Sequence, residues 1–302
     1  MKMVKTPYEI INELKSNSVK NVILDTDAYN EIDDQYAIAY AMQSSDRVNL
    51  LALCAAPFLN NRSTSAGDGM IQSYNEIFKI TKLTDKNRSI PIYKGSDSFL
   101  SSKDVPVESE AADKIAEIVM NSAETVYIVA IGAITNVASA IIKHPEIVDK
   151  AVVVWLGGHA LSYPDTAEFN LKQDVFAAQV VFDSNISLVQ IPCFGVCSEF
   201  LTTIPELEYY MSEKNELCDY LLDVTKNYTK NPYAWSKVIW DVTAVALFTV
   251  PSAYDIAAMP RPFVTSDKKY AFDMARAPYV YVRRLRRDPI YADLFKKLTS
   301  VK

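Results

Sequence analysis

The sequence predicts an α/β fold with a mostly parallel central sheet flanked by helices. Short apolar runs rich in β-branched residues recur along the chain, and each run is typical of a strand buried on both faces. Stretches with helical spacing of apolar residues separate these runs, and this alternation indicates parallel strands joined by helices. The 302 residues and the 49% hydrophobic composition are sufficient for a packed core. We therefore expect a Rossmann-like open sheet.

The expected elements follow in order along the chain. The predicted strands are 21–24, 48–53, 126–131, 151–156 and 186–191. The predicted helices are 69–80, 109–123, 134–142 and 173–182. From about 205 to 250 the pattern becomes helical, and a mixed tail over 262–302 ends in the amphipathic segment YADLFKKL. Because no Gly/Ser linker or repeat interrupts the chain, we predict a single domain over residues 1–302 with a helical excursion at about 205–250.

Composition limits the classes of partner. A net charge of −6 argues against nucleic-acid binding, and we interpret the arginine cluster at 283–287 as a solvated or ion-paired face. No apolar run reaches the roughly 18 residues of a membrane span, and the N-terminal segment lacks the apolar stretch of a secretory signal, so we expect a cytoplasmic protein with no membrane partner. The four cysteines are expected to be reduced and mostly buried.

Four aspartates gather after the first predicted strand, within the segment VILDTDAYNEIDDQ. Asp25 and Asp27 lie at the strand end, and Asp33 and Asp34 begin the probable helix. Carboxylates this close raise one another's pKa, which costs free energy unless a cation or strong donors compensate. Several carboxylates with spare positions for water suit calcium and its shell of about 6–8 oxygen ligands. The alternative interpretation is that the aspartates are ordinary turn and N-cap residues.

This DxD, turn and DD pattern resembles the opening motif of the nucleoside hydrolase family, whose members include inosine-uridine preferring enzymes. The resemblance implies that Asp27 binds calcium and acts as general base on the attacking water. It implies further that Asp34 is a bidentate calcium ligand, that Asp33 holds the ribose 2′-hydroxyl, and that Asp25 supports the cluster from behind. The turn AYNEI is longer than the family's usual Pro-Gly turn, which affects the expected placement of Asp33.

The resemblance continues in two further segments. In APFLNNRST, Asn60 matches the family's asparagine that reaches the sugar and the metal-bound water, with Asn61 as the second choice. In VAIGAITNVASAI, the match to the family's G-x-L-T-N turn implies that the backbone carbonyl of Thr135 is a calcium ligand. An ordinary helix cap is the alternative for Thr135.

The segment GGHALSYPDTAEFN resembles the family's ribose-binding motif. Glu168 and Asn170 fall on its EFN pair, whose side chains grip the ribose hydroxyls. Many relatives carry an asparagine eight residues before Asn170, where this chain has Ser162, so the contact to the 5′-hydroxyl is in question. His159 is either a pocket residue or a structural histidine.

The last matching segment is SKVIWDVTAVALF. Asp241 corresponds to the distal calcium ligand, and Trp240 replaces the histidine that pyrimidine-selective and broad-range members use as proton donor to the leaving base. This replacement resembles the purine-selective branch, where aromatic stacking on the base takes over that role; packing in the core is the alternative for Trp240. Tyr233 and Trp235 are candidates to complete an aromatic wall.

Together these matches predict hydrolysis of the N-glycosidic bond of ribonucleosides, with purine ribosides favoured, through a calcium-bound water activated by Asp27. The catalytic candidates are Asp27 and Trp240, and the resemblance implies a homodimer or homotetramer. Two alternatives stay open. One is a hydrolase-like protein that binds a nucleoside or sugar without turnover, and the other is a metal-dependent phosphatase that uses the DxD motif.

Overall fold

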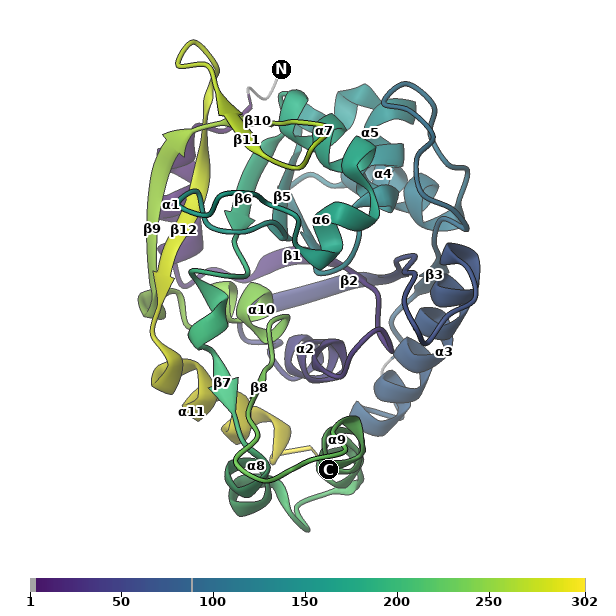
Figure 1. Cartoon of the computed structure of the whole chain (residues 1–302), viewed down its shortest axis with the longest axis vertical. Helices are drawn as coiled ribbons and strands as arrows, with labels where there is room; N and C mark the ends of the chain where they lie inside the picture. The colour runs from purple at the N-terminus through teal and green to yellow at the C-terminus, as the bar shows by residue number, and fades with distance from the viewer. Residues whose placement is uncertain (1–3, 88, 302) are drawn as a thin grey trace.

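The computed structural model describes residues 4–87 and 89–301. Its centre is an eight-stranded sheet with the order β3-β2-β1-β4-β5-β6-β12-β9 (Figure 1). All neighbouring pairs in it are parallel except β12 and β9, which confirms the predicted mostly parallel sheet flanked by helices. The strands of this sheet are β1 Lys20–Thr26, β2 Val48–Ala55, β3 Ile92–Lys94, β4 Val126–Ala130, β5 Ala151–Leu156, β6 Ser187–Ile191, β9 Tyr254–Pro260 and β12 Pro278–Leu285.

Helices connect the strands as the sequence predicts. The α-helices are α1 Pro7–Lys15, α2 Asp33–Met42, α3 Ala66–Thr84, α4 Glu110–Asn121, α5 Thr135–Lys143, α6 Phe169–Gln173, α7 Val175–Asp183, α8 Ile204–Met211, α9 Glu216–Tyr228, α10 Val242–Thr249 and α11 Arg287–Leu298. The predicted helical excursion contains α8, α9 and α10. It also contains the strand β8 Lys237–Val238, which pairs with β7 Leu201–Thr202. A second small hairpin joins β10 Pro262–Val264 to β11 Tyr270–Phe272.

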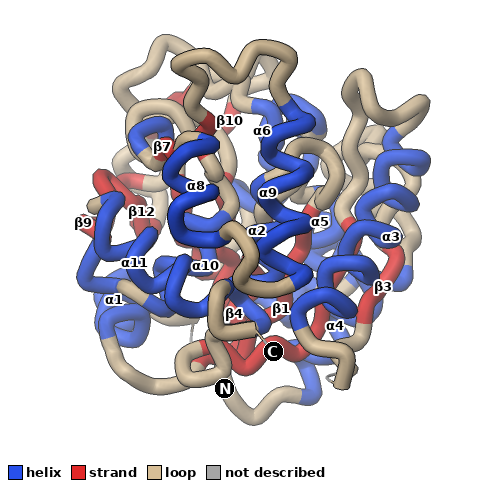
Figure 2. The backbone as a smooth tube through the Cα atoms, turned by 90° about the horizontal axis from the view of Figure 1, so that it is seen from below, coloured by secondary structure: helices blue, strands red, loops and turns tan. Residues whose placement is uncertain are grey.

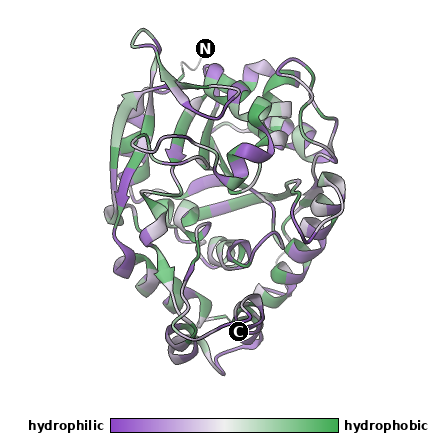
Figure 3. Ribbon diagram, in the orientation of Figure 1, coloured by the Kyte–Doolittle hydropathy of each residue, from purple (hydrophilic) through white to green (hydrophobic). Residues whose placement is uncertain are grey.

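The core lies on both faces of the sheet, because successive side chains of a strand point to opposite faces. In β1, Val22 and Leu24 belong to the cluster under α1, α2 and α10, whereas Ile23 belongs to the cluster under α4, α5 and α7. The inner strands are largely apolar, while α3 and α9 alternate between polar and apolar faces (Figure 3). The tube view shows the strands lying among the helices (Figure 2). This burial on both faces explains the continuous apolar runs in the sequence.

Several elements were not predicted. Strand β12 is buried over residues 279–282 but then exposes Arg283 and Arg284, and the two charged residues shorten its apolar run. Arg283 forms an ion pair with Asp255 of β9, as expected for a surface arginine. The first helix, α1, begins with a capping box made by Thr6 and Glu9, a local pattern that apolar periodicity does not reveal.

Two further observations concern the chain as a whole. The four cysteines are free and buried, as predicted. Over the described ranges, no helix combines the length and the apolar character needed to cross a bilayer. The organisation as one domain stays a prediction.

The strand order places a topological switch point between β1 and β4. The chain runs from β1 outwards to β2 and β3, and then returns to add β4 on the other side of β1. Asp25 at the end of β1 pairs in register with Ala130 of β4, and its carbonyl accepts a hydrogen bond from Ile131 N. In open α/β sheets, ligands bind beyond the carboxyl ends of the strands at such a point. The acidic segment therefore begins where this fold is expected to bind a ligand.

Candidate active site

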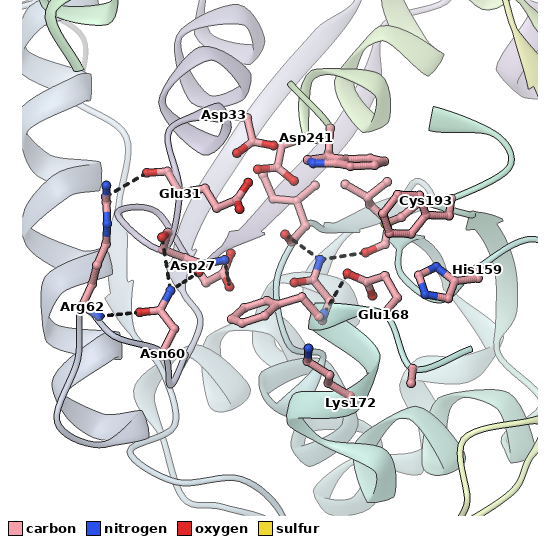
Figure 4. A pocket seen from close by; sticks show the side chains of 18 of the residues that line it. Asp27, Glu31, Asp33, Asn60, Arg62, His159, Glu168, Lys172, Cys193 and Asp241 are labelled. Atoms are coloured by element: carbon pink, nitrogen blue, oxygen red, sulfur yellow. Dashed lines mark hydrogen bonds between the residues drawn. The ribbon is translucent and has the colours of Figure 1, made fainter. Parts of the chain in front are cut away.

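A cavity of about 620 Å³ lies at the carboxyl edge of the sheet, next to the switch point (Figure 4). Its size is within the roughly 300–1,000 Å³ typical of small-ligand pockets. Its lining contains carboxylates, amides, aromatic rings and the two cationic side chains of Arg62 and Lys172. The predicted site residues that line it are Asp27, Asp33, Asn60, Glu168, Asn170, Trp240 and Asp241.

Carboxylates from two helix starts converge at this cavity. Asp33 and Asp34 form the first turn of α2, and Asp241 is the N-cap residue of α10. Each of these three buried side chains offers an oxygen atom within 4.8 Å of the other two. The N-termini of both helices carry partial positive charge, which favours the ionised carboxylates there. The longer AYNEI turn therefore still places Asp33 and Asp34 beside Asp241.

Burial raises the pKa of every carboxyl group in this cluster. The pKa of Asp34 rises to about 7, because burial and the charge of Asp33 disfavour its ionised form. Burial, Asp34 and Asp33 raise the pKa of Asp27 well above its ordinary range, and burial, Asp33 and Asp34 do the same for Asp241. Raised pKa values in a cleft are a property of functional carboxylates and of metal sites, where a cation restores the ionised forms.

Asp25 lies behind the cluster, fully buried, and does not line the cavity. Its Oδ1 atom accepts a hydrogen bond from Asn136 Nδ2 at 2.8 Å, while its Oδ2 atom is buried without a partner. Asn136 also binds Ala55 O and accepts hydrogen bonds from Ser96. The T-N pair of the G-A-I-T-N segment thus contributes its asparagine to the support of Asp25.

The donor set fits a hard divalent cation. Only carboxylate oxygens converge in the Asp33, Asp34 and Asp241 group, and calcium and magnesium both prefer oxygen ligands. Asp27 adjoins this group, since its charge acts on Asp241 and its side chain packs against Gly132. A Cβ atom on Gly132 would lie 3.0 Å from the Asp27 side chain, so this glycine permits the close approach.

The structure places Thr135 outside the cavity lining. Thr135 begins α5, where its carbonyl is oriented to accept a helical hydrogen bond, and its hydroxyl donates to Asp174 Oδ2 at 2.8 Å. Ile131, directly after β4, does line the cavity, and its carbonyl accepts a hydrogen bond from Asn170 Nδ2. Ile131 is therefore better placed than Thr135 to offer a backbone oxygen to the site.

Two amide side chains connect the loops beside Asp27. Asn60 Nδ2 donates to Asn30 Oδ1 at 2.6 Å, and Asn30 Nδ2 donates to Asp27 Oδ2 at 3.2 Å. Asn60 Oδ1 accepts from Arg62 N. Asn61 also lines the cavity. Sequence reasoning missed Asn30, although its position inside the acidic segment is a usable signal.

Glu168 and Asn170 have different capacities left for a ligand. The Glu168 carboxylate accepts hydrogen bonds from the backbone N–H groups of Gly158, Asn170 and Leu171 and also binds the thiol of Cys193. A carboxylate has about four acceptor sites, so these bonds nearly saturate Glu168. The Asn170 amide donates to Ile131 O and Leu156 O, so its Oδ1 atom keeps acceptor capacity for a ligand in the cavity that Asn170 lines.

Aromatic rings, together with the imidazole of His159, form one part of the cavity wall, which we call the aromatic wall. Trp240 contacts Phe194 edge to face at 5.4 Å between ring centroids, Phe194 lies 5.0 Å from His159, and His159 lies 5.5 Å from Tyr163. Tyr233 does not complete this wall, because its side chain is 89% exposed. Trp235 also lies outside the cavity lining and instead faces Tyr228.

The rim of the cavity contains a network that the sequence did not indicate. Glu31, from the AYNEI turn, forms an ion pair with the buried Lys237 and accepts a hydrogen bond from Tyr228 Oη at 2.9 Å. Arg62 lies over the rings of Tyr29 and Tyr228 and donates to the carbonyls of Tyr29 and Glu31. These contacts connect the acidic turn to the helical excursion.

The fold and the site together define a class of protein: an α/β protein with a buried carboxylate cluster, suited to a divalent cation, beside an aromatic wall at the switch point of a parallel sheet. Comparison with known proteins then identifies the family. The model of the inosine-uridine preferring nucleoside hydrolase family matches residues 22–277, and the chain belongs to this family. The family match assigns the DxD motif to nucleoside hydrolases and not to phosphatases.

Relatives of known sequence and structure agree with this assignment. The chain is 24% identical over 254 residues to the non-specific ribonucleoside hydrolase RihC of Klebsiella pneumoniae (strain 342), covering 78% of this chain and 81% of that protein. It is 30% identical over 161 residues to the inosine-uridine preferring nucleoside hydrolase of Crithidia fasciculata, a match that spans 51% of each chain, so about half the length of that relative. A purine-preferring ribonucleoside hydrolase from Gardnerella vaginalis has the same fold, with a TM-score of 0.76 at 21% identity over 93% of this chain and 99% of that one.

Proposed function

We propose that the protein hydrolyses the N-glycosidic bond of ribonucleosides to ribose and free base, with purine ribosides favoured. The observation that carries the proposal is the lining of the cavity, which combines buried carboxylates with an aromatic wall. A ribonucleoside has the matching parts, since its sugar presents a vicinal diol and its base is flat. Family membership supports the reaction class, and relatives similar to this chain include a non-specific ribonucleoside hydrolase and the pyrimidine-specific ribonucleoside hydrolase RihA of Salmonella newport (strain SL254), which is 36% identical over 87 residues. The purine preference is therefore drawn from Trp240.

Calcium is the proposed cofactor, held by Asp34 and Asp241 with Asp27 and a backbone carbonyl. Asp33 lies within the same group of oxygens and is the proposed partner of the ribose 2′-hydroxyl. Bound calcium would supply a Lewis acid that lowers the pKa of water in the site. Because Ile131 lines the cavity and Thr135 does not, we assign the backbone ligand to the carbonyl of Ile131 in place of Thr135.

Residues of the chain activate the water, bind the sugar and stabilise the charge on it. Asp27, buried at the cavity wall, is the proposed general base that takes the proton of the attacking water. Asn60 and Asn30 hold the Asp27 side of the cavity through their hydrogen bonds, and the free Oδ1 atom of Asn170 accepts a hydrogen bond from a ribose hydroxyl. The buried carboxylates favour the positive charge that develops on the ribosyl ring as the bond to the base breaks.

Departure of the base is assigned to the aromatic wall. Trp240 presents an indole ring next to Asp241, and Phe194 fixes that ring through an edge-to-face contact. A purine stacked on Trp240 is held with its bond to the sugar above the carboxylates, and stacking on a large flat ring is strongest for the larger bases. Without a histidine at position 240, the proton for the base comes from solvent.

The test is an assay of inosine, guanosine, adenosine, uridine and 2′-deoxyinosine, following released sugar and base with calcium present and after chelation. We expect calcium-dependent hydrolysis of the purine ribosides, weaker hydrolysis of uridine, and rejection of 2′-deoxyinosine, since Asp33 would lose its hydroxyl partner. The Asp27→Asn variant is the control and should bind inosine without cleaving it. Tight binding of all ribosides with no release by the unaltered protein would instead show a non-catalytic binding protein.

Two proposals concern the whole molecule. We propose that the chain forms a single domain and that copies associate as a homodimer or homotetramer, as the family resemblance implies. Limited proteolysis and size-exclusion chromatography with light scattering test these points. Release of a stable fragment that lacks residues 205–250, or a monomer at all protein concentrations, would contradict them.

A further inference from the structure

The aromatic wall contains one titratable side chain that the proposed reaction does not use. His159 follows Gly158 in the loop after β5 and packs against Tyr163 and Phe194. It lines the cavity and is only 9% exposed. Its Nδ1 atom is buried without a hydrogen-bond partner, whereas Nε2 is not among the buried unpartnered atoms of the described residues. The imidazole is thus held by ring contacts, with Nε2 as the nitrogen that a ligand can reach.

His159 is at the end of the cavity away from the metal-binding carboxylates. Figure 4 shows Glu168 between Asp27 and His159. The charges that shift the pKa of His159 are those of Asp165 and Lys172. The charges that shift the pKa of Asp27 are those of Asp34, Asp33 and Glu168, so the two side chains have different charged neighbours. A sugar whose vicinal diol is held at the carboxylates therefore extends its opposite side past Glu168 towards His159.

Two substituents are attached to that opposite side of a ribosyl ring. They are the base on C1′ and the hydroxymethyl group on C4′. The base is flat and suits Trp240, which adjoins Asp241. The hydroxymethyl group ends in a hydroxyl that needs a polar partner once it is buried. Its partner must come from the far end of the cavity.

Most polar groups of the described residues at that end already form hydrogen bonds within the protein. Glu168 accepts three backbone hydrogen bonds and one from the thiol of Cys193. Both amide hydrogens of Asn170 bind carbonyls. Ser162 is exposed and does not line the cavity. Two other polar atoms remain at this end of the described lining. Asn170 Oδ1 is assigned above to a hydroxyl of the ribose ring, and Lys172 has an exposed side chain whose Nζ atom lies over the Phe169 ring. The Nε2 atom of His159 is then the polar atom of the aromatic wall that is available to the hydroxymethyl group.

We propose that His159 determines specificity at C5′ by forming a hydrogen bond between Nε2 and the 5′-hydroxyl of the ribosyl group. The proposal rests on the proposed ribonucleoside hydrolase function and adds a residue to it. The buried Nδ1 atom favours the neutral tautomer with the proton on Nε2, because a proton on Nδ1 would be buried without an acceptor. His159 then acts as a donor to the 5′-oxygen, and ribosides that lack this oxygen are poorer substrates.

The test pairs a change in the protein with a change in the substrate. The variants are His159→Phe, which keeps the ring packing, and His159→Gln, which restores a donor. His144→Phe is the matched control, because it removes the chain's other histidine at a partly exposed site outside the cavity. For the unaltered protein we expect kcat/KM to fall about tenfold from inosine to 5′-deoxyinosine, as for the loss of one hydrogen bond.

His159→Phe should lower kcat/KM for inosine about tenfold and leave that for 5′-deoxyinosine nearly unchanged, so the two substrates become equivalent. His159→Gln should restore part of the difference, and His144→Phe should retain all of it. An equal loss on both substrates would overturn the proposal. If p-nitrophenyl riboside, whose leaving group needs no proton, were also cleaved at the full rate by His159→Phe, the histidine would act on the base instead.

A binding measurement separates this proposal from the proposed function. The probes are 1,4-anhydro-D-ribitol, which has the sugar hydroxyls and no base, and its 5-deoxy counterpart, followed by ligand-observed NMR with calcium present. The unaltered protein should bind the first about tenfold more tightly, and His159→Phe should bind both equally. If the protein cleaves no riboside but shows this difference, only the proposed function fails. Equal affinity of the unaltered protein for the two probes overturns the role of His159.

Discussion

The carboxylate cluster should destabilise the protein when no cation is present, and the substitution Asp34→Asn measures this effect. Burial and Asp33 raise the pKa of Asp34 from its ordinary value of 3.8 to about 7. The native state therefore binds this proton more tightly than the unfolded chain does. The resulting penalty is absent below about pH 4, grows as the pH rises, and is complete above about pH 7. At about 1.4 kcal/mol per pH unit, it amounts to about 4 kcal/mol.

The Asn side chain reproduces the protonated form of Asp34. It can accept a hydrogen bond from the Thr26 hydroxyl, as Asp34 Oδ1 does, and its amide can donate to Asp241, with which Asp34 shares a hydrogen bond. In the presence of a chelator at pH 8, we expect the free energy of unfolding of Asp34→Asn to exceed that of the unaltered protein by about 2–4 kcal/mol. At pH 4.5 the contribution of this ionisation to the difference should fall to about 1 kcal/mol.

The assay is urea denaturation at both pH values, with chelator and then with increasing calcium. Calcium should stabilise the unaltered protein at pH 8 because it binds the native state, and it should stabilise Asp34→Asn far less. The reasoning is refuted if metal-free Asp34→Asn is the less stable protein at pH 8, or if calcium stabilises both proteins equally.

Three further substitutions probe the surroundings of the cluster. Asn136→Ala leaves both oxygens of Asp25 without partners and should lower the free energy of unfolding by about 2–4 kcal/mol in urea denaturation; an unchanged midpoint would contradict the support role. Lys237→Met should cost about 1–3 kcal/mol, because Glu31 loses its ion pair but is partly exposed and keeps the hydrogen bond from Tyr228, and a double-mutant cycle with Glu31→Gln should recover a coupling of about 1 kcal/mol, whereas additive effects would show an uncoupled pair. Trp240→Leu should lower kcat/KM about tenfold more for inosine than for uridine, and an equal loss would remove the basis for the purine preference.

The inner part of the fold could be predicted because its signals are local. The runs at 21–24, 48–53 and 151–156 are mainly apolar, and beyond Asn21 and Asn49 at the strand starts the sheet covers both faces of those strands. Strand β3 is three residues long, and the apolar part of β12 is only four residues long before Arg283 and Arg284, so the signal of each strand is short. Apolar patterning therefore identifies strands in the middle of a sheet better than those near its edges.

For the candidate site too, residues within one local segment could be predicted, and contacts between distant loops could not. Asp27, Asp33 and Asp34 lie in one segment, and a local motif is enough to identify them. The ring contacts of His159 and Phe194 arise from the loops after β5 and β6, which become neighbours only when those strands pair. No local pattern specifies such a contact. The same limit applies to Thr135, since the sequence shows the turn but not which of its carbonyls reaches the cavity.

The AYNEI turn shows how a local departure from the family pattern is accommodated by distant residues. Its extra length is absorbed on the outer side, where Tyr29 takes a left-handed backbone conformation with φ of 81°. Glu31 is then fixed by Lys237, which lies 206 residues further along the chain. The inner side of the turn keeps Asp33 at the start of α2, within reach of Asp34 and Asp241. The longer turn therefore provides no argument for lost turnover, and Ser162 is the departure from the family pattern that still bears on the non-catalytic alternative. If His159 binds the 5′-hydroxyl, as we propose, the exposed position of Ser162 does not weaken the site either.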